Sequence, residues 1–374
     1  MRARSLQILG LVALLCACIP RAGSERAPVL QIGTSGDYAP FSLDGEGFDI
    51  EVARRLASDL GYRIEWLPFA WPELEARMAR GDFDLVMSGV TWRVRRAVIA
   101  PLSLAVAVGG PCLLSRAGAS ERIVVNAGGF LESWVRAAYP DARITAVAAN
   151  RSLPDLLASR EFDALATDRF ELASFRREGW SARCEPPIHA KAYWVSERRH
   201  PGLLAKLDAW IRSHPDLLRE LSERYFDGAV SDGDPANRQL ADLVRRRLAL
   251  MPHVASWKRA RDIAIEDPKR ERQVLARTRE RAALAGLRPA EMEAFVALQI
   301  EFAKRGQRRS PAPDAAFDLL SELRPRLLEL AGRMQDSIAA GARLDPAASD
   351  LLDPWLEESE IAALLELPLA AGPE

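Results

Sequence analysis

A short stretch rich in glycine and aspartate, residues 227–235, divides the sequence into two parts with different patterns of apolar residues. Before it, short apolar runs typical of strands alternate with segments of helical spacing. After it, only helical spacing occurs. Alternating strands and helices favour an α/β sheet, whereas helices alone favour a bundle. We therefore expect an α/β domain over residues 29–229, an all-α domain over 235–340, and an acidic, leucine-rich tail over 341–374 to which we assign no function.

The composition sets limits on what the chain binds. Its 374 residues are 48% hydrophobic and 28% charged, which suffices for two cores, and the net charge is −1. A general nucleic-acid binder is disfavoured, so recognition of an anion must be local. The four histidines are scattered and no CxxC motif occurs. We expect neither a metal ion nor another cofactor.

The N-terminus has the pattern of an export signal. Arg2 and Arg4 precede an apolar run over residues 6–15 that is too short to span a membrane. Residues 15–18 resemble a bacterial lipoprotein cleavage box, which predicts a signal peptide over 1–18 and lipidation of Cys18; ordinary cleavage after a small residue is the alternative. The expected protein is periplasmic and touches the membrane only through that lipid.

Two further cysteines, Cys112 and Cys184, remain if the first two belong to the signal. In an exported protein an even pair favours a disulfide. Because the closed loop is long, such a bond adds about 4 kcal/mol in the chain-entropy model.

The alternation of strands and helices in the first part of the chain predicts an α/β sheet whose ligand crevice lies at the carboxyl ends of the strands. Polar loops, residues 33–42 and 88–91, follow two of these strands, but loops are polar in any case. The strands are expected over residues 29–33, 63–67, 83–87, 122–125 and 162–166, and the helices over 50–60, 71–80, 130–139, 153–160, 169–178 and 203–225.

Together with Gly47-Phe-Asp-Ile50, Phe83-Asp84 and Thr167-Asp168, these loops resemble the type 3 periplasmic solute-binding proteins. This resemblance implies two lobes, residues 29–114 with 192–228 and residues 115–190, that hold a small ligand in a hinged cleft. The likeness is strongest to the periplasmic cyclohexadienyl dehydratases, which remove water and carbon dioxide from prephenate or arogenate. It is carried by residues 34–42, 71–72, 87–89, 126–129, 167–171 and 191–193, and by Cys112 and Cys184.

The dehydratase resemblance implies a role for each cleft residue. Glu171 is the general acid, and it must be protonated near the working pH. Burial among aromatic residues such as Trp71, Phe130 or Trp194 would favour the protonated form, whereas a position at a helix start opposes it. Arg96 binds a carboxylate, with hydroxyls of Ser88 and Thr91 as further donors and Lys191 as a second cation. The remaining substrate-binding residues are Tyr38, Trp71 and Asp168.

Simpler interpretations of the same residues stay open. Glu171 can be a surface residue at a helix start and Lys191 a solvent-facing hinge residue. The chain also departs from the dehydratases, with Phe130-Leu131 in place of small polar residues and an atypical segment over 101–106. A domain that only binds an amino acid or an aromatic precursor is therefore the alternative, with Asp168 as the partner of an ammonium group.

The second part opens with an amphipathic helix, residues 240–258. Its cations Arg247 and Lys258 are eleven residues apart, about 20° beyond three turns, so one face would carry both. Pro252 is expected to distort this helix. Asp267 as N-cap and a following proline predict a new helix that carries Arg270 in its first turn. Further helices are expected over residues 269–285, 289–305 and 315–340, the last broken near Pro325.

Cations gathered inside a bundle suggest a pocket for a small polyanion, although arginines commonly decorate solvated helix faces. The run R-L-x(5)-V-A-x-W-K-x(6)-I-E-D-P-x-R-E over residues 247–271, with residues 299–307, resembles the secreted all-helical chorismate mutases. That resemblance implies that Arg247 and Arg324 hold carboxylates, Lys258 and Gln307 face the ether oxygen, Arg270 completes the cationic wall, and Asp267 and Glu271 orient the ring hydroxyl. Ala303 replaces a polar residue of the family.

The expected fold is thus a two-lobed α/β periplasmic-binding-protein domain followed by an all-α chorismate mutase domain. We expect a bifunctional enzyme whose helical domain makes prephenate and whose first domain consumes it, or consumes arogenate. The rivals are a working mutase fused to a non-catalytic solute-binding domain and a helical part that serves only for dimerisation. The expected partners are small-molecule substrates, and the sequence leaves a homo-oligomer open.

Overall fold

The computed structural model describes residues 27–116, 118–175, 177–186, 189–226, 235–310, 317–353 and 355–369. The predicted signal peptide, the lipidation site at Cys18 and most of the predicted linker lie outside these residues. Within them, no helix combines the length and the apolar character needed to cross a bilayer.

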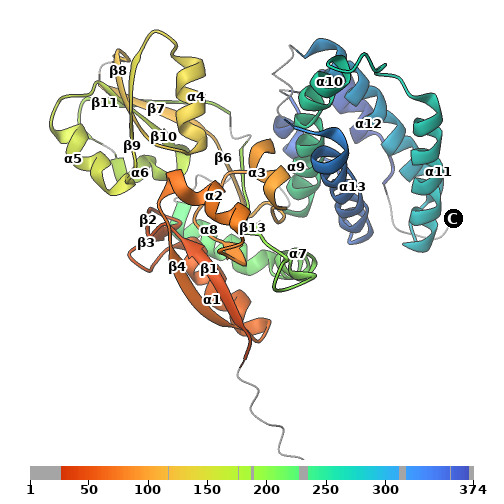
Figure 1. Ribbon diagram of the computed structural model, residues 1–374, viewed down its shortest axis with the longest axis horizontal. Coiled ribbons are helices and arrows are strands. Elements are labelled where there is room, and N and C mark those ends of the chain that lie inside the picture. Colours follow the sequence, from red (N-terminus) through yellow and green to blue (C-terminus); the bar gives the residue numbers. More distant parts are fainter. Residues whose placement is uncertain are drawn as a thin grey trace, which may run out of the picture.

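Two α/β lobes occupy the left of Figure 1, and the helices from α9 onward occupy the right. The first lobe contains a four-stranded sheet in the order β13-β5-β1-β4, in which only β13 is antiparallel to its neighbour. Its strands are β1 (Val29–Thr34), β4 (Arg63–Pro68), β5 (Leu85–Val86) and β13 (Trp194–Val195), with a small hairpin of β2 (Asp37–Tyr38) and β3 (Ser42–Leu43). Its helices are α1 (Phe48–Asp59), α2 (Leu74–Arg80), α3 (Val94–Ile99), α7 (Leu203–Ser213) and α8 (Pro215–Phe226).

The second lobe has a five-stranded sheet in the order β11-β7-β10-β8-β9. Its strands are β7 (Pro111–Arg116), β8 (Arg122–Asn126), β9 (Arg143–Val147), β10 (Ala164–Asp168) and β11 (Trp180–Cys184), and its helices are α4 (Phe130–Ala138), α5 (Leu153–Ala158) and α6 (Leu172–Phe175). Because β7 pairs with β10 and β11 along its length, residues 111–114 belong to this sheet rather than to the first lobe.

The two lobes are joined by a short antiparallel pair, β6 (Ala107–Gly109) and β12 (His189–Lys191). Lys191 pairs with Ala107 at one end of this ladder. The cleft between the lobes therefore borders directly on the connecting strands.

The second part of the chain is helical, as predicted. It comprises α9 (Pro235–Ala249), α10 (Met251–Arg259), α11 (Pro268–Leu284), α12 (Pro289–Arg309), a π-helical turn η4 (Leu319–Leu323), α13 (Arg324–Ala339), a 3-10 turn η5 (Pro346–Leu351) and α14 (Glu358–Leu365). The segment after α13 buries Leu351 and Leu364 and packs η5 against α9. An ion pair between Arg305 and Glu360 fastens it to α12.

Two predicted helices are each broken into two. The prediction of one continuous helix over residues 240–258 is wrong, because α9 ends at Ala249 and α10 begins at Met251. Pro252 has no N–H, and it is tolerated here only because it lies in the first turn of α10. Arg247 and Lys258 therefore lie on different helices and share no helix face. In the same way, Pro215 begins α8 and divides the helix predicted over residues 203–225.

The helical domain packs against the first lobe through buried charges. Arg246, with no exposed surface, forms an ion pair with Asp242 at 2.6 Å and donates to the carbonyl of Ser103 at 2.8 Å. Arg333 of α13 donates to the carbonyl of Leu102 at 2.7 Å and pairs with Asp208 of α7 at 2.8 Å. The segment over residues 101–106, which departs from the dehydratase pattern, is thus the surface on which the helical domain docks.

Candidate functional sites

A small cavity of about 30 Å³ lies in the cleft between the lobes. It has room for little more than water, so the lobes must part to admit an organic ligand. Of the residues predicted for the site, Tyr38, Trp71, Thr91, Arg96, Asp168, Glu171 and Lys191 line it, together with Asn126, Phe130, Leu131 and Asn150.

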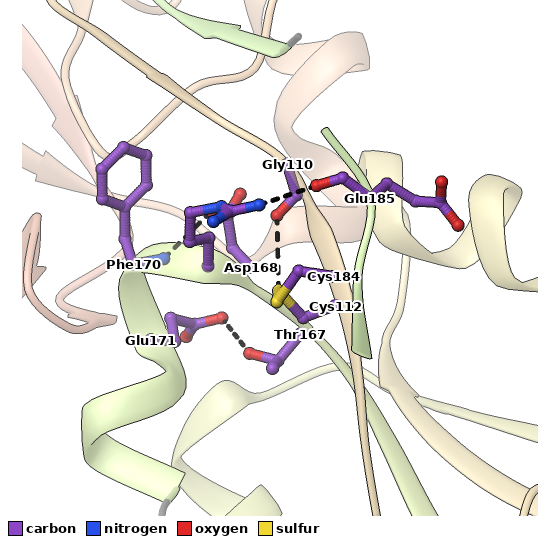
Figure 2. Close-up of a disulfide and its surroundings, with 9 residues drawn as sticks. Gly110, Cys112, Thr167, Asp168, Phe170, Glu171, Cys184 and Glu185 are labelled. Atoms are coloured by element: carbon purple, nitrogen blue, oxygen red, sulfur yellow. Dashed lines mark hydrogen bonds between the residues drawn. A yellow bond between two sulfur atoms is a disulfide. The ribbon is translucent and has the colours of Figure 1, made fainter. Parts of the chain in front are cut away.

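Glu171 lies just beyond the carboxyl end of β10, in a 3-10 turn that precedes α6. Glu171 is 3% exposed, and its carboxyl group accepts a hydrogen bond from the hydroxyl of Thr167 at 2.8 Å. Figure 2 shows this bond as a dashed line. Burial raises the pKa of Glu171 to about 8; the charge of Asp168 adds to this, while the Thr167 hydrogen bond and Lys191 oppose it. Glu171 is therefore protonated at neutral pH, although it lies at a helix start.

Lys191 is 2% exposed, and its ammonium group has three partners. It pairs with Asp168 at 2.8 Å and donates to the hydroxyls of Tyr38 and Thr91, each at 3.0 Å. Since an ammonium group has three N–H donors, all are in use. Lys191 can therefore act on a substrate through its charge, or through a new hydrogen bond only if one of these partners is replaced.

Arg96 is 1% exposed and only partly satisfied. One guanidinium nitrogen donates to the carbonyl of Thr91 at 3.0 Å, and Nε lies 3.6 Å from Glu75, but Nη2 has no hydrogen-bond partner among the described residues. Burial, followed by the charge of Arg93, lowers the pKa of Arg96 to about 9, which leaves it cationic at neutral pH. A buried guanidinium with a free N–H, lining a cavity, is suited to bind a carboxylate.

Ser88 was predicted as a donor in the cleft, but it does not line the cavity. Its hydroxyl lies 2.6 Å from that of Ser42, which is also fully buried, and 2.8 Å from that of the partly buried Ser35. Ser88 therefore holds the loop after β1 against the loop after β5.

Sequence reasoning missed a contact between the lobes. Arg93 donates to Glu75 at 2.5 Å and to the carbonyl of Gly129 in the second lobe at 3.3 Å. Glu75 also contacts Arg95 at 2.7 Å. In the sequence, the only indication of this contact between the lobes is a cluster of arginines after residue 92.

A disulfide joins Cys112 of β7 to Cys184 of β11. In the sheet register Cys112 faces Thr167 of β10, so the bond lies beside the strand that carries the hydrogen-bond partner of Glu171 (Figure 2). The disulfide therefore supports the strands that position the acid.

A second cavity, of about 280 Å³, lies within the helical domain. That volume is near the lower end of the range for small-molecule sites. Five arginines line it, namely Arg247, Arg270, Arg277, Arg281 and Arg324, along with apolar residues that include Met292, Phe295 and Met334. No acidic residue lines this cavity, and none of the five arginines has an ion-pair partner within the described ranges. Arg277 and Arg281 were not predicted. They lie seven and eleven residues after Arg270 on α11, and this spacing, which places all three on one helix face, could have indicated them.

The other residues predicted for the helical site do not line this cavity. Lys258 donates to the carbonyl of Ile265 at 2.7 Å, and the buried amide of Gln307 lies 3.7 Å from the sulfur of Met251. Asp267 caps α11 by accepting from the backbone N–H of Arg270. Glu271 accepts from the backbone N–H of Asp267 and pairs with Lys304 at 3.2 Å.

Comparison with known proteins gives the same division of the chain. Residues 30–228 match the family model "Bacterial extracellular solute-binding proteins, family 3", and residues 234–308 match "Chorismate mutase type II". The cyclohexadienyl dehydratase of Pseudomonas aeruginosa is 30% identical over 252 residues, which span 59% of this chain and 93% of that protein. An arginine-binding extracellular protein of Bacillus subtilis is 38% identical over 95 residues, 22% of this chain and 37% of that protein.

Among solved structures, an ancestral amino acid-binding protein described as a precursor of cyclohexadienyl dehydratase is 25% identical, with a TM-score of 0.48, over 53% of this chain and 95% of that one. The family match spans more than half of the chain, and the dehydratase is matched over nearly its whole length. The chain therefore belongs to family 3 of the bacterial extracellular solute-binding proteins, within its cyclohexadienyl dehydratase group, and continues into a chorismate mutase type II domain.

Proposed function

We propose that this chain catalyses two successive reactions, the rearrangement of chorismate to prephenate in the helical domain and the conversion of prephenate to phenylpyruvate in the cleft between the lobes. The observation that carries the proposal is that each domain holds the group its reaction needs. Among the described residues, the helical cavity is lined by arginines without an ion-pair partner and by no carboxylate, and the cleft cavity is lined by a buried carboxylic acid and a buried, partly unsatisfied arginine.

The first reaction breaks an ether C–O bond as a C–C bond forms, and it needs neither a nucleophile nor a proton transfer. The enzyme has to hold a dicarboxylate in its folded conformer and stabilise negative charge on the ether oxygen. Arg247, Arg270 and Arg324 bind the carboxylates. Burial lowers the pKa of Arg247 to about 10, so this side chain remains cationic at neutral pH. We assign the ether oxygen to Lys258 and Gln307. Because neither side chain lines the cavity in this conformation, both must turn toward it, and Lys258 must release the carbonyl of Ile265.

The second reaction turns the ring of prephenate into an aromatic one. Glu171 gives its proton to the ring hydroxyl, which leaves as water. The electron pair of the bond to the ring carboxylate moves into the ring as carbon dioxide departs. Arg96 binds a carboxylate, and the apolar side chains of Phe130 and Leu131 exclude water from the closed cleft.

A binding-only first domain is the rival proposal, because amino-acid-binding proteins match parts of the first domain. Such a domain needs a free carboxylate for the ligand's ammonium group. In this chain the carboxylate of Asp168 is already paired with the ammonium group of Lys191, and burial keeps the carboxyl group of Glu171 protonated. Both features favour a keto-acid substrate and a proton donor over an amino-acid ligand.

We further propose that the protein is exported through its N-terminal signal and is tethered by a lipid on Cys18, the first residue of the mature chain. The family of extracellular proteins to which the chain belongs supports export. Expression in a Gram-negative host followed by fractionation and mass spectrometry of the mature N-terminus tests both steps. A mature chain that begins at a residue other than Cys18 contradicts the lipid anchor.

The two activities are tested separately with the purified protein. Chorismate supplied to Lys258→Ala should be consumed at least a hundredfold more slowly than by the wild type, the loss expected for one group that stabilises a developing charge. Prephenate supplied to the same variant should still give phenylpyruvate at the wild-type rate. Unchanged chorismate consumption by Lys258→Ala would show that the assignment of the mutase site is wrong.

A further inference from the structure

The floor of the cavity in the helical domain contains an unpaired amide. Gln299 of α12 lines this cavity and is only 2% exposed. Its Oε1 atom is buried and accepts no hydrogen bond from any described residue. A buried acceptor without a donor destabilises the folded protein, so native proteins rarely retain one without a ligand or water to satisfy it.

The chemistry of the missing partner follows from what surrounds the amide. The arginines of the cavity supply N–H donors for carboxylates, but a carboxylate cannot donate to Oε1. A ligand that satisfies both kinds of group, the arginines and the amide oxygen, is an anion that also carries a hydroxyl. Its size is limited by the cavity of about 280 Å³, and the apolar side chains of Phe295 and Met334 line that cavity beside the arginines.

The residues predicted to orient such a hydroxyl are engaged elsewhere. Asp267 caps α11, Glu271 pairs with Lys304, and neither lines the cavity. Gln299, by contrast, lines the cavity, and its buried amide oxygen has no donor among the described residues.

We infer that Gln299 is a substrate-binding residue of the mutase site and that its amide oxygen accepts the hydrogen bond of the substrate's ring hydroxyl. This inference rests on the proposed mutase function. It adds a hydroxyl-recognition point on α12 to the carboxylate-binding arginines of α9, α11 and α13. Specificity for the hydroxylated dicarboxylate then comes from Gln299, and charge attraction comes from the arginines.

Replacement of Gln299 by leucine distinguishes a role in substrate binding from a purely structural role. Gln299→Leu should lower kcat/KM for chorismate roughly ten- to hundredfold, because a hydroxyl left without a partner in a buried site is costly. Without ligand, the same variant should unfold at an equal or higher temperature than the wild type, because an unpaired buried amide has been removed. A purely structural glutamine predicts the reverse, a lower unfolding temperature.

A chorismate analogue without the ring hydroxyl provides the decisive comparison. The wild type should lose roughly ten- to hundredfold in kcat/KM on this analogue, and Gln299→Leu should show no further loss. Gln273→Leu, an exposed site on α11 outside the cavity, is the matched control and should behave as the wild type in both assays. Full activity of Gln299→Leu on chorismate, or losses that multiply on the analogue, would overturn the inference.

Failure of the proposed mutase function is distinguished by a binding measurement. An oxabicyclic dicarboxylate that mimics the transition state can be prepared with and without its hydroxyl, and calorimetry gives its affinity. A preference for the hydroxylated form in the wild type that disappears in Gln299→Leu supports the inference even if chorismate is not turned over. An equal affinity of the wild type for both forms contradicts the inference whether or not the mutase is active.

Discussion

Glu171 retains its proton at neutral pH because its carboxyl group is buried, which raises its pKa to about 8. A general acid works only while it is protonated, so kcat/KM for prephenate should be level below about pH 8 and fall about tenfold per pH unit above it. The folded protein also binds one proton more than the unfolded chain between the ordinary pKa of 4.5 and 8, so this group's contribution to stability is lost as the pH rises through that window.

The pH profile of prephenate turnover, followed by phenylpyruvate absorbance, tests this prediction. Chorismate consumption by the same protein is the internal control. It should not fall near pH 8, because Arg247 stays charged there. A dehydratase rate that increases above pH 8 contradicts the assignment of Glu171 as the acid.

We predict that Lys191 determines which substrate the cleft accepts. Its ammonium group forms an ion pair with Asp168, the carboxylate with which the ammonium group of an amino-acid substrate would have to pair. We therefore predict a higher kcat/KM for prephenate than for arogenate. Lys191→Met should lower turnover of prephenate and shift the ratio toward arogenate by roughly tenfold, about 1.4 kcal/mol. The exposed Lys206→Met is the matched control; a ratio unchanged in Lys191→Met would contradict this role.

Among the secondary-structure elements, the strands β7 and β11 are joined by the disulfide next to β10. The double variant Cys112→Ala, Cys184→Ala should lose about 4 kcal/mol of unfolding free energy in urea, since 72 residues separate the cysteines. Prephenate turnover should fall, because Thr167 faces Cys112 across the sheet. The mutase activity of the same preparation should be unchanged, and an equal loss of both activities would show that the effect is not local to β10.

Sequence patterns predicted the elements with strong periodicity and failed where tertiary contacts decide. The helices α1, α4 and α11 lie within two residues of their predicted bounds, because each has a buried stripe or a clear cap. The other strands were missed, namely β2, β3, β6, β7, β9, β11, β12 and β13. A strand gains its stability largely from the strands it pairs with, which its own residues do not reveal. Pro252 was expected only to distort one continuous helix, whereas the structure has two helices, α9 and α10, with Pro252 in the first turn of α10.

The candidate sites were predictable where a motif carries the chemistry. Arg247, Arg270 and Arg324 were found from their sequence context, and the structure gathers them around one cavity. Gln299 lay inside the quoted motif, but nothing in the sequence indicates that its amide oxygen is buried and unpaired. Trp194, expected among the aromatics around Glu171, does not line the cleft cavity.

At the scale of the whole molecule, the helical domain and the first lobe share a buried polar interface. Arg246 contacts carbonyls 143 and 144 residues away in the sequence, and Arg333 contacts one 231 residues away. Contacts of that range leave no local pattern, so the docking was not predictable from the sequence.

Arg246→Met should destabilise the protein by roughly 3–5 kcal/mol, because it leaves Asp242 buried without this partner. Scanning calorimetry should then resolve separate unfolding of the two domains where the wild type unfolds in a more concerted way. Arg272→Met, at an exposed site on α11, is the control and should change little. A wild-type thermogram for Arg246→Met would show that the interface contributes nothing to cooperativity.

The central claim is that one polypeptide carries chorismate through to phenylpyruvate. The most direct measurement is the time course of products formed from chorismate alone by the wild type and by Glu171→Gln. The wild type should yield phenylpyruvate after prephenate has passed through a maximum, and Glu171→Gln should consume chorismate at the wild-type rate and stop at prephenate. Prephenate that accumulates unchanged with the wild-type protein would contradict the account.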